Sequence, residues 1–202
     1  MDLRNSIILA TMLQKPESSP YEFVDYIQAP SGGPYIDTGI KPDPTIIIQC
    51  KFVMKAYDGN TFIGHQKSES DCFRFFRADT LTYLDYGSGS GHNRIQVEFI
   101  KSKTKIYNVE LGNRYIKNLD TGKKVISDTD EDFAEKNYTV KLFDSTNYGI
   151  VYYLKIKKHG SWVRDYIPVL NKETNKYGLY DQVSNTFFGN NGTGDFTGGY
   201  NS

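Results

Sequence analysis

The stretch that decides the fold is Ser161–Gly199, which reads SWVRDYIPVLNKETNKYGLYDQVSNTFFGNNGTGDFTGG. Its first part alternates between two faces, with Trp162, Arg164 and Tyr166 on one and Val163, Asp165 and Ile167 on the other. A period of two is typical of a half-buried β-strand, so we expect a strand over Trp162–Leu170. Pro168 indicates an edge or the end of that strand, because proline has no N–H to donate to a neighbour.

The rest of the stretch predicts further short strands joined by tight turns. A polar turn at Asn171–Asn175 precedes Tyr177, Leu179 and a short strand at Phe187–Phe188. Glycines then recur, and they permit tight backbone paths: Gly189, Gly192, Gly194, Gly198 and Gly199. This pattern is typical of the end of an antiparallel β-sandwich.

Four motifs of this tail resemble the end of a concanavalin A-like, LamG-like jelly-roll domain found in bacteriophage and prophage proteins of gut bacteria. The family's motifs read roughly V-R-D-F-I-P, G-L-Y-D, N-x-x-F-Y and G-T-G-x-F. Their counterparts here are Val163–Pro168, Gly178–Asp181, Asn185–Phe188 and Gly192–Phe196. The resemblance implies an all-β, concanavalin A-like jelly-roll sandwich of two antiparallel sheets.

Two further segments carry the same resemblance. Tyr26–Gly39 is similar to the family's opening, Y-I-x-S-x-G-x-Q-Y-I-D-T-G, although Pro30 and Pro34 depart from it. Tyr83–Gly87 resembles a mid-domain aromatic-Asp-Tyr-Gly element. The resemblance therefore covers about residues 21–199.

Composition agrees with one large β domain. A chain of 202 residues is long enough to bury a core of its own. Its 16 Tyr and 12 Phe suit strands, where aromatic rings pack well on a pleated surface. The 24 basic and 24 acidic residues cancel, so nothing favours nucleic acid as a partner. No apolar run approaches the ~20 residues of a membrane-spanning helix, so we expect no membrane insertion.

Alternation predicts many strands after residue 44. We expect them at Thr45–Met54, Thr61–Gly64, Cys72–Ala78, Leu81–Tyr86, Arg94–Ile100, Lys105–Leu111, Tyr115–Leu119, Tyr138–Phe143, Gly149–Lys158 and Trp162–Leu170. His159–Ser161 should close a hairpin between the last two. Cys50 and Cys72 fall in expected strands, and the sequence leaves open whether they form a disulfide or are two small buried side chains.

The N-terminal segment predicts a helix over Asp2–Gln14, with Asp2 as N-cap and Pro16 as the stop. Its apolar stripe consists of Leu3, Ile7, Ile8, Ala10, Met12 and Leu13. Because so short a helix is marginal alone, the stripe should pack on its own sandwich or on a partner chain; the third alternative is that the segment is disordered. We expect residues 1–20 to be an assembly anchor with a polar linker, and residues 21–202 to be the sandwich.

Catalysis and metal binding have weak support in the sequence. Asp130–Glu135 loosely matches the E-x-D-x-x-E motif of glucanases that share this fold, but the run DTDEDFAEK indicates a solvated loop. We therefore expect no enzyme activity. Asp128, Asp130 and Asp132 alternate as calcium ligands can, yet the glycine and distal glutamate of a calcium loop are missing. Calcium is the one cofactor candidate, and a charged hairpin tip is the ordinary alternative.

Carbohydrate binding is the role most often attached to this fold, and it requires exposed rings beside hydrogen-bonding side chains. The densest such mixture lies in one predicted hairpin. The candidates are Arg74, Phe76, Arg77, Asp79, Tyr83, Asp85 and Asn93. Most rings of a sandwich pack in its core, so the charged and amide side chains are the better candidates.

Arg164, Asp165 and Asp181 lie in the family-like tail, and we expect them to form a structural ion pair that fixes the last strands.

The resemblance implies a non-enzymatic, virion-associated protein that presents its sandwich for glycan or host-surface recognition. Its partners would be other virion proteins or further copies of itself, through the N-terminal helix, and we expect a homo-oligomer. The alternative is a purely structural virion decoration or connector protein that contacts neighbouring subunits. A bacterial cell-surface carbohydrate-binding module or a glycoside hydrolase remains a further alternative.

Overall fold

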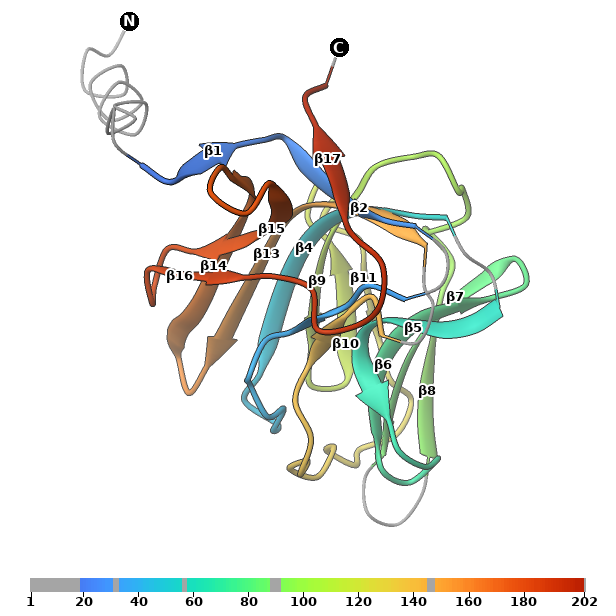
Figure 1. Ribbon diagram of the computed structural model, residues 1–202. Helices are drawn as coiled ribbons and strands as arrows, with labels where there is room; N and C mark the ends of the chain where they lie inside the picture. Colours follow the sequence, from blue (N-terminus) through green and yellow to red (C-terminus); the bar gives the residue numbers. More distant parts are fainter. Residues whose placement is uncertain (1–18, 31–32, 56–57, 88–91, 145–147, 202) are drawn as a thin grey trace, which may run out of the picture.

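The computed structural model describes residues 19–30, 33–55, 58–87, 92–144 and 148–201. They form an all-β sandwich of two antiparallel sheets, as the alternation predicts (Figure 1). No helix occurs in these ranges, and hence none that could cross a membrane. The expected helix at Asp2–Gln14, with its apolar stripe, lies outside the described residues.

The larger sheet has eleven strands in the order β11-β10-β9-β4-β13-β14-β15-β16, with β1 on β14, β2 on β13 and β17 on β2. Their bounds are β1 Tyr21–Phe23, β2 Tyr26–Ala29, β4 Ile47–Met54, β9 Tyr107–Gly112, β10 Tyr115–Asn118, β11 Lys124–Ile126, β13 Gly149–Lys158, β14 Ser161–Asn171, β15 Lys176–Asp181, β16 Thr186–Phe188 and β17 Thr197–Gly199.

The smaller sheet has six strands in the order β3-β12-β5-β6-β7-β8. Their bounds are β3 Ile36–Asp37, β5 Asp58–Gln66, β6 Cys72–Ala78, β7 Leu81–Gly87, β8 His92–Val97 and β12 Lys141–Leu142. In Figure 1 the consecutive strands β5–β8 stand apart from β13–β16, which form the opposite flank of the molecule.

The core lies between the sheets and is built by the alternation along each strand. Phe52 of β4 and Phe75 of β6 meet edge to face, with ring centroids 5.6 Å apart. Both rings are fully buried. Cys50 lies in β4 and Cys72 in β6, so they belong to different sheets, and both are buried free thiols. The open question of a disulfide is thereby answered: the two cysteines do not pair.

The late hairpin has the predicted turn. Lys158 pairs with Ser161 across a two-residue connection, and His159 and Gly160 both have positive φ, 49° and 82°. Two positive φ values define the type I′ turn, whose twist matches that of the flanking strands.

Pro168 does not end its strand, because β14 continues to Asn171. Instead β14 changes neighbours there: its pairing with β13 runs to Tyr166, and its pairing with β1 begins at Val169. The missing N–H of Pro168 therefore falls between two partner strands, while its carbonyl accepts a hydrogen bond from the Val24 N–H at 3.1 Å. Proline is tolerated because no ladder bond is lost at that position.

Several expected strands are shorter than the sequence predicts. The structure has only Lys141–Leu142 in the predicted Tyr138–Phe143 strand, and β8 ends at Val97 rather than Ile100. Residue Phe143 has φ of 63°, a left-handed conformation that interrupts the strand geometry.

Candidate ligand-binding face

Strands β6, β7 and β8 place a row of polar and aromatic side chains on the side of the small sheet that faces away from the core. Arg74 of β6 is opposite Asp85 of β7, which is opposite Arg94 of β8. The next row is Phe76, Tyr83 and Gln96. The intervening residues point inward and belong to the core: Phe73, Phe75, Leu84 and Ile95. We call Arg74, Phe76, Tyr83, Asp85, Arg94 and Gln96 the outer face.

The carboxylate of Asp85 is the centre of the outer face. It is fully buried, and it accepts hydrogen bonds from Arg94 Nε at 2.8 Å and Arg94 Nη2 at 2.9 Å. Arg74 donates from Nη2 at 3.1 Å and from Nε at 3.3 Å. A buried charge is tolerated when it is paired and hydrogen-bonded, and two guanidinium groups meet that requirement here.

Aromatic rings support both guanidinium groups. The Cζ of Arg74 lies 3.9 Å from the ring centroid of Phe76, and that of Arg94 lies 4.7 Å from the ring centroid of Tyr83. Phe76 is 3% exposed although it lies outside the core cluster, because the arginines cover it. Hydrogen bonding to Asp85 raises the pKa of Arg94, so the Arg94 guanidinium stays protonated. The outer face is thus a rigid, prearranged surface.

A pocket of about 370 Å³ continues the outer face toward the β6–β7 turn. Gln96 belongs to both, and Leu81, Glu98 and Lys101 contribute further side chains. Leu81 is 36% exposed, and Gln96 and Glu98 are exposed. The pocket therefore combines an apolar wall with an amide, a carboxylate and an ammonium group. Hydroxyl-rich ligands are bound by such a combination of apolar contact and few polar groups.

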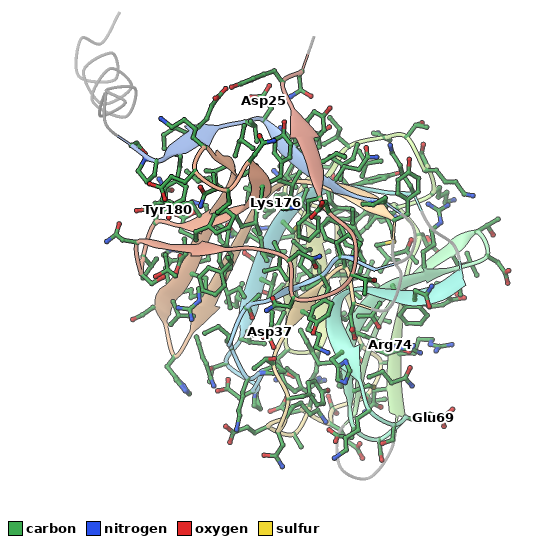
Figure 2. All side chains as sticks on the ribbon, in the orientation of Figure 1. Asp25, Asp37, Glu69, Arg74, Lys176 and Tyr180 are labelled. Carbon is green, nitrogen blue, oxygen red and sulfur yellow. The ribbon has the colours of Figure 1, made fainter. Side chains whose placement is uncertain are left out.

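The structure places the sequence-predicted site residues in different parts of the small sheet. The structure brings Arg74, Phe76, Tyr83 and Asp85 together. Figure 2 labels Arg74 on the small sheet. Asn93 is buried and pairs with Tyr86 on the core side. Asp79 lies in the β6–β7 turn with φ of 52°, beyond the strand.

Arg77 points to the core side and is only 1% exposed, so it is not part of the outer face. Its guanidinium donates to the carbonyl oxygens of Ser102, Lys101 and Thr80, at 3.1, 2.5 and 3.4 Å. These hydrogen bonds allow the charged group to be buried, whereas the sequence pattern placed Arg77 in the exposed candidate site. Because Thr80 and Lys101 line the pocket, Arg77 holds the pocket's backbone in place.

Arg94 and Gln96 were not among the sequence-predicted site residues. The signal for them is present in the sequence, because Arg94, Gln96 and Glu98 alternate with Ile95, Val97 and Phe99. That alternation predicts which side of the strand is polar. It does not reveal which residues of β6 and β7 lie opposite.

The acidic segment over residues 127–140 contains no strand, as expected, but it is not solvated throughout: Phe133 packs in the core and Lys136 is buried. Arg114 donates to Asp130 at 2.8 Å, and Asn113 donates to Asp132 at 2.7 Å. Among the described residues no three His, Cys, Asp or Glu side chains come close enough to hold a metal ion. The fully exposed Asp130 carboxylate has no apolar surroundings of the kind that keep a catalytic acid protonated.

Arg164, Asp165 and Asp181 of the tail make contacts between neighbouring strands of the large sheet. Arg164 Nη1 lies 3.7 Å from Asp181 Oδ2, and Lys155 Nζ lies 2.9 Å from Asp165 Oδ2. Asp181 also accepts a hydrogen bond from the backbone N–H of Asp165 at 2.8 Å. Arg164 and the backbone of Asp165 therefore connect β14 to Asp181 of β15. The Asp165 carboxylate is not part of this ion pair, because it binds Lys155 of β13 instead.

A second pocket, of about 300 Å³, lies by the large sheet, near Lys176, which Figure 2 labels. Its ionic side chains bind each other, since Lys176 Nζ lies 2.7 Å from both oxygens of Asp195. Its amide, Asn190, accepts from the Tyr35 and Gly192 N–H groups and donates to the Gly192 and Gly194 carbonyls. These polar groups are already hydrogen-bonded within the protein and are not available to a ligand, so the outer face is the better candidate site.

In comparisons with known proteins, no family model and no curated protein matches this chain.

Proposed function

We propose that this protein is a non-enzymatic, lectin-like β-sandwich of the concanavalin A-like jelly-roll type that binds cell-surface glycans through its outer face. The resemblance of the tail motifs to phage and prophage domains supports a virion-associated adhesion role. The single observation that carries glycan binding is that Tyr83 lies directly opposite Gln96, which also lines the adjoining pocket.

The chemistry of this surface suits a sugar ring. A pyranose has apolar C–H faces that pack on an aromatic or aliphatic surface, here Tyr83 and Leu81. Its hydroxyl groups require donors and acceptors, and Gln96, Glu98 and Lys101 supply both kinds. The ion pairs of Asp85 with Arg74 and Arg94 hold the outer face in position and so reduce the entropy lost on binding.

Affinity of a single shallow site should be low. A dissociation constant of about 1 mM corresponds to only about 4 kcal/mol of binding free energy. Display of several copies on one particle can raise the apparent affinity by about 10²- to 10⁴-fold. A virion protein present in many copies would therefore use such a site effectively.

The proposal is tested with the full chain, displayed in many copies on beads, on a glycan array. For each glycan that the wild type binds, Tyr83→Ala and Gln96→Ala should each weaken binding about tenfold. The first removes the ring that packs on the sugar, and the second removes the amide that hydrogen-bonds its hydroxyl groups. Trp162→Ala is the matched control, because Trp162 is an exposed ring on β14 of the other sheet. It should leave binding unchanged.

Two outcomes would contradict glycan binding through this face. If the array shows no binding by a folded wild-type protein, the structural decoration or connector role takes its place. If Trp162→Ala weakens binding as much as Tyr83→Ala does, the site lies elsewhere. Thermal melts of all variants establish that they are folded.

We also propose that residues 2–14 attach the protein to other virion proteins or to further copies of itself, through the apolar stripe of Leu3, Ile7 and Leu13. Light scattering of the full chain gives its oligomeric state. Replacing these three residues together by Ser should yield monomers if the segment holds copies together. If the wild type is an oligomer and the variant has the same mass, the sandwich itself is the contact surface; a monomeric wild type would contradict self-association.

A further inference from the structure

We propose that the outer face selects glycans that carry an anionic group, a carboxylate or a sulfate, and that Arg94 binds that group. This inference rests on the proposed glycan binding and adds the chemical class of the sugar. It follows from the charge, exposure and hydrogen bonding of Arg74, Asp85 and Arg94.

Charge is unbalanced on the outer face. Its ionic side chains are two guanidinium groups and the single carboxylate of Asp85. The adjoining pocket adds Glu98 and Lys101, whose charges cancel. Among the side chains that the structure describes on this surface, one positive charge is therefore left over, and it lies next to the rings that would contact a sugar.

Exposure assigns that charge to Arg94. Its side chain is 44% exposed, whereas that of Arg74 is 14% exposed and also donates from Nη1 to the Gly59 carbonyl at 3.5 Å. Arg94 uses Nε and Nη2 for Asp85, and its Nη1 has no hydrogen bond to any residue that the structure describes. Nη1 and the outer side of Nη2 form an edge that can receive two oxygens of an anion.

The guanidinium is also held in position before any ligand arrives. Asp85 fixes one edge of Arg94, and the rings of Tyr83 and Phe76 lie 4.7 Å and 5.5 Å from its Cζ. A free arginine side chain would lose much rotamer freedom on binding an anion, and this one has already lost it. Prearrangement favours a planar carboxylate or a sulfate, because both match the spacing of the guanidinium N–H groups.

The experiment uses two matched pairs of polymers with the full chain: polygalacturonate against its methyl ester, and dextran sulfate against dextran. Wild-type protein should bind at least one acidic polymer about tenfold more tightly than its neutral counterpart at low salt. Arg94→Gln should reduce that preference to less than about twofold, and Arg94→Lys should retain only part of it. Asp85 stays paired with Arg74 in both variants, so the fold is preserved.

Arg114→Gln is the matched control, because it also removes one arginine that is paired with an aspartate, Asp130, in a different part of the chain. Its acid preference should equal that of the wild type. Equal loss in Arg114→Gln would show attraction by overall charge alone and would overturn the proposal. An unchanged preference in Arg94→Gln would overturn it as well.

The remaining outcomes separate this inference from glycan binding itself. Equal binding of acidic and neutral polymers overturns the acid selection and leaves the proposed function standing. If the protein binds none of the four polymers but binds neutral glycans on the array, acid selection is likewise overturned and the proposed function stands. If neither the polymers nor the array show binding, both proposals fail.

Discussion

The carboxylate of Asp181 accepts a 2.8 Å hydrogen bond from the backbone N–H of Asp165, so the end of β15 is fastened to the middle of β14. The same carboxylate accepts from Val183 N–H and Ser184 N–H, both at 3.2 Å, and from Ser184 Oγ at 2.6 Å. One buried side chain thus closes the β15–β16 turn and joins it to the neighbouring strand.

Substitution of Asp181 by Asn should destabilise the protein by about 3 kcal/mol. The N–H and O–H groups that donate to the carboxylate lose a charged acceptor, and Arg164 loses its ion-pair partner. Urea unfolding measures the loss. Asp195→Asn is the matched control: Asp195 is 61% exposed and pairs with exposed Lys176, so its loss should cost less than about 1 kcal/mol. Equal losses in the two variants would contradict the role of Asp181.

Stability should also fall at acid pH through Asp181. Burial would raise its pKa, but the hydrogen bonds from Asp165, Ser184 and Val183 outweigh burial and hold the pKa below the ordinary 3.8. A carboxyl with a lowered folded-state pKa stabilises the fold above its unfolded pKa, and this contribution disappears as pH falls through the folded value. The stability gap between wild type and Asp181→Asn should therefore narrow below about pH 4. A constant gap from pH 7 to pH 3 would contradict this assignment.

Sequence patterns predict the strands of the outer face, but neither their register nor which side of the β6–β7 hairpin lies outward, since the predicted candidates Arg77 and Asn93 lie on the core side. The bounds of β6 are those that alternation predicts, Cys72–Ala78. Which residue lies opposite Arg74 depends on the turn at Asp79 and Thr80: once Ala78 pairs with Leu81, Arg74 must meet Asp85. A connection one residue longer would shift that pairing, and alternation carries no information about it.

Other features depend on contacts between distant residues. β17 contains Gly198 and Gly199, which give no side-chain signal, and it exists because it pairs with β2 far earlier in the chain. Arg77 is buried because the carbonyl oxygens of Lys101 and Ser102, far along the chain, accept its N–H groups together with that of the nearby Thr80. No pattern within one strand predicts such acceptors, so a rule that charges stay exposed misplaces this arginine.

Removal of Asp85 should be more damaging than removal of Arg94. Asp85→Asn leaves two guanidinium groups facing each other without their carboxylate, at a cost of about 3 kcal/mol. Arg94→Gln leaves the Asp85–Arg74 pair intact and removes a partly exposed partner, so about 1 kcal/mol is expected. Denaturant unfolding at low and high salt measures both. The reverse order of stability would show that Asp85 does not hold the outer face together.

Gly64 should be intolerant of alanine. It has φ of 107°, and a Cβ there would overlap the carbonyl oxygen of Phe73 and the Cα of Arg74 in the adjoining strand. We expect Gly64→Ala to cost about 3 kcal/mol or more, through backbone strain and a forced separation of β5 from β6. Gly160→Ala is the control: its φ is 82°, but nothing lies within 4 Å of the new Cβ, so only about 1 kcal/mol of strain is expected. Equal thermal stability of the two variants would contradict the close approach at Gly64.

Both thiols should be unreactive in the folded protein. Burial raises the pKa of Cys72 to about 11, with the negative charge of Asp85 adding to the effect, and burial raises the pKa of Cys50 further. The thiolate is the reactive species, so a disulfide reagent such as Ellman's reagent at pH 8 should modify neither residue within minutes. In denaturant the same reagent should modify both, since they are free rather than paired. The same reagent can be applied to the Asp85→Asn variant. If Cys72 reacts there as slowly as in the wild type, its burial in the small sheet is what protects it. Modification of either thiol in native wild type would mean that β4 or β6 opens far more readily than their buried positions imply.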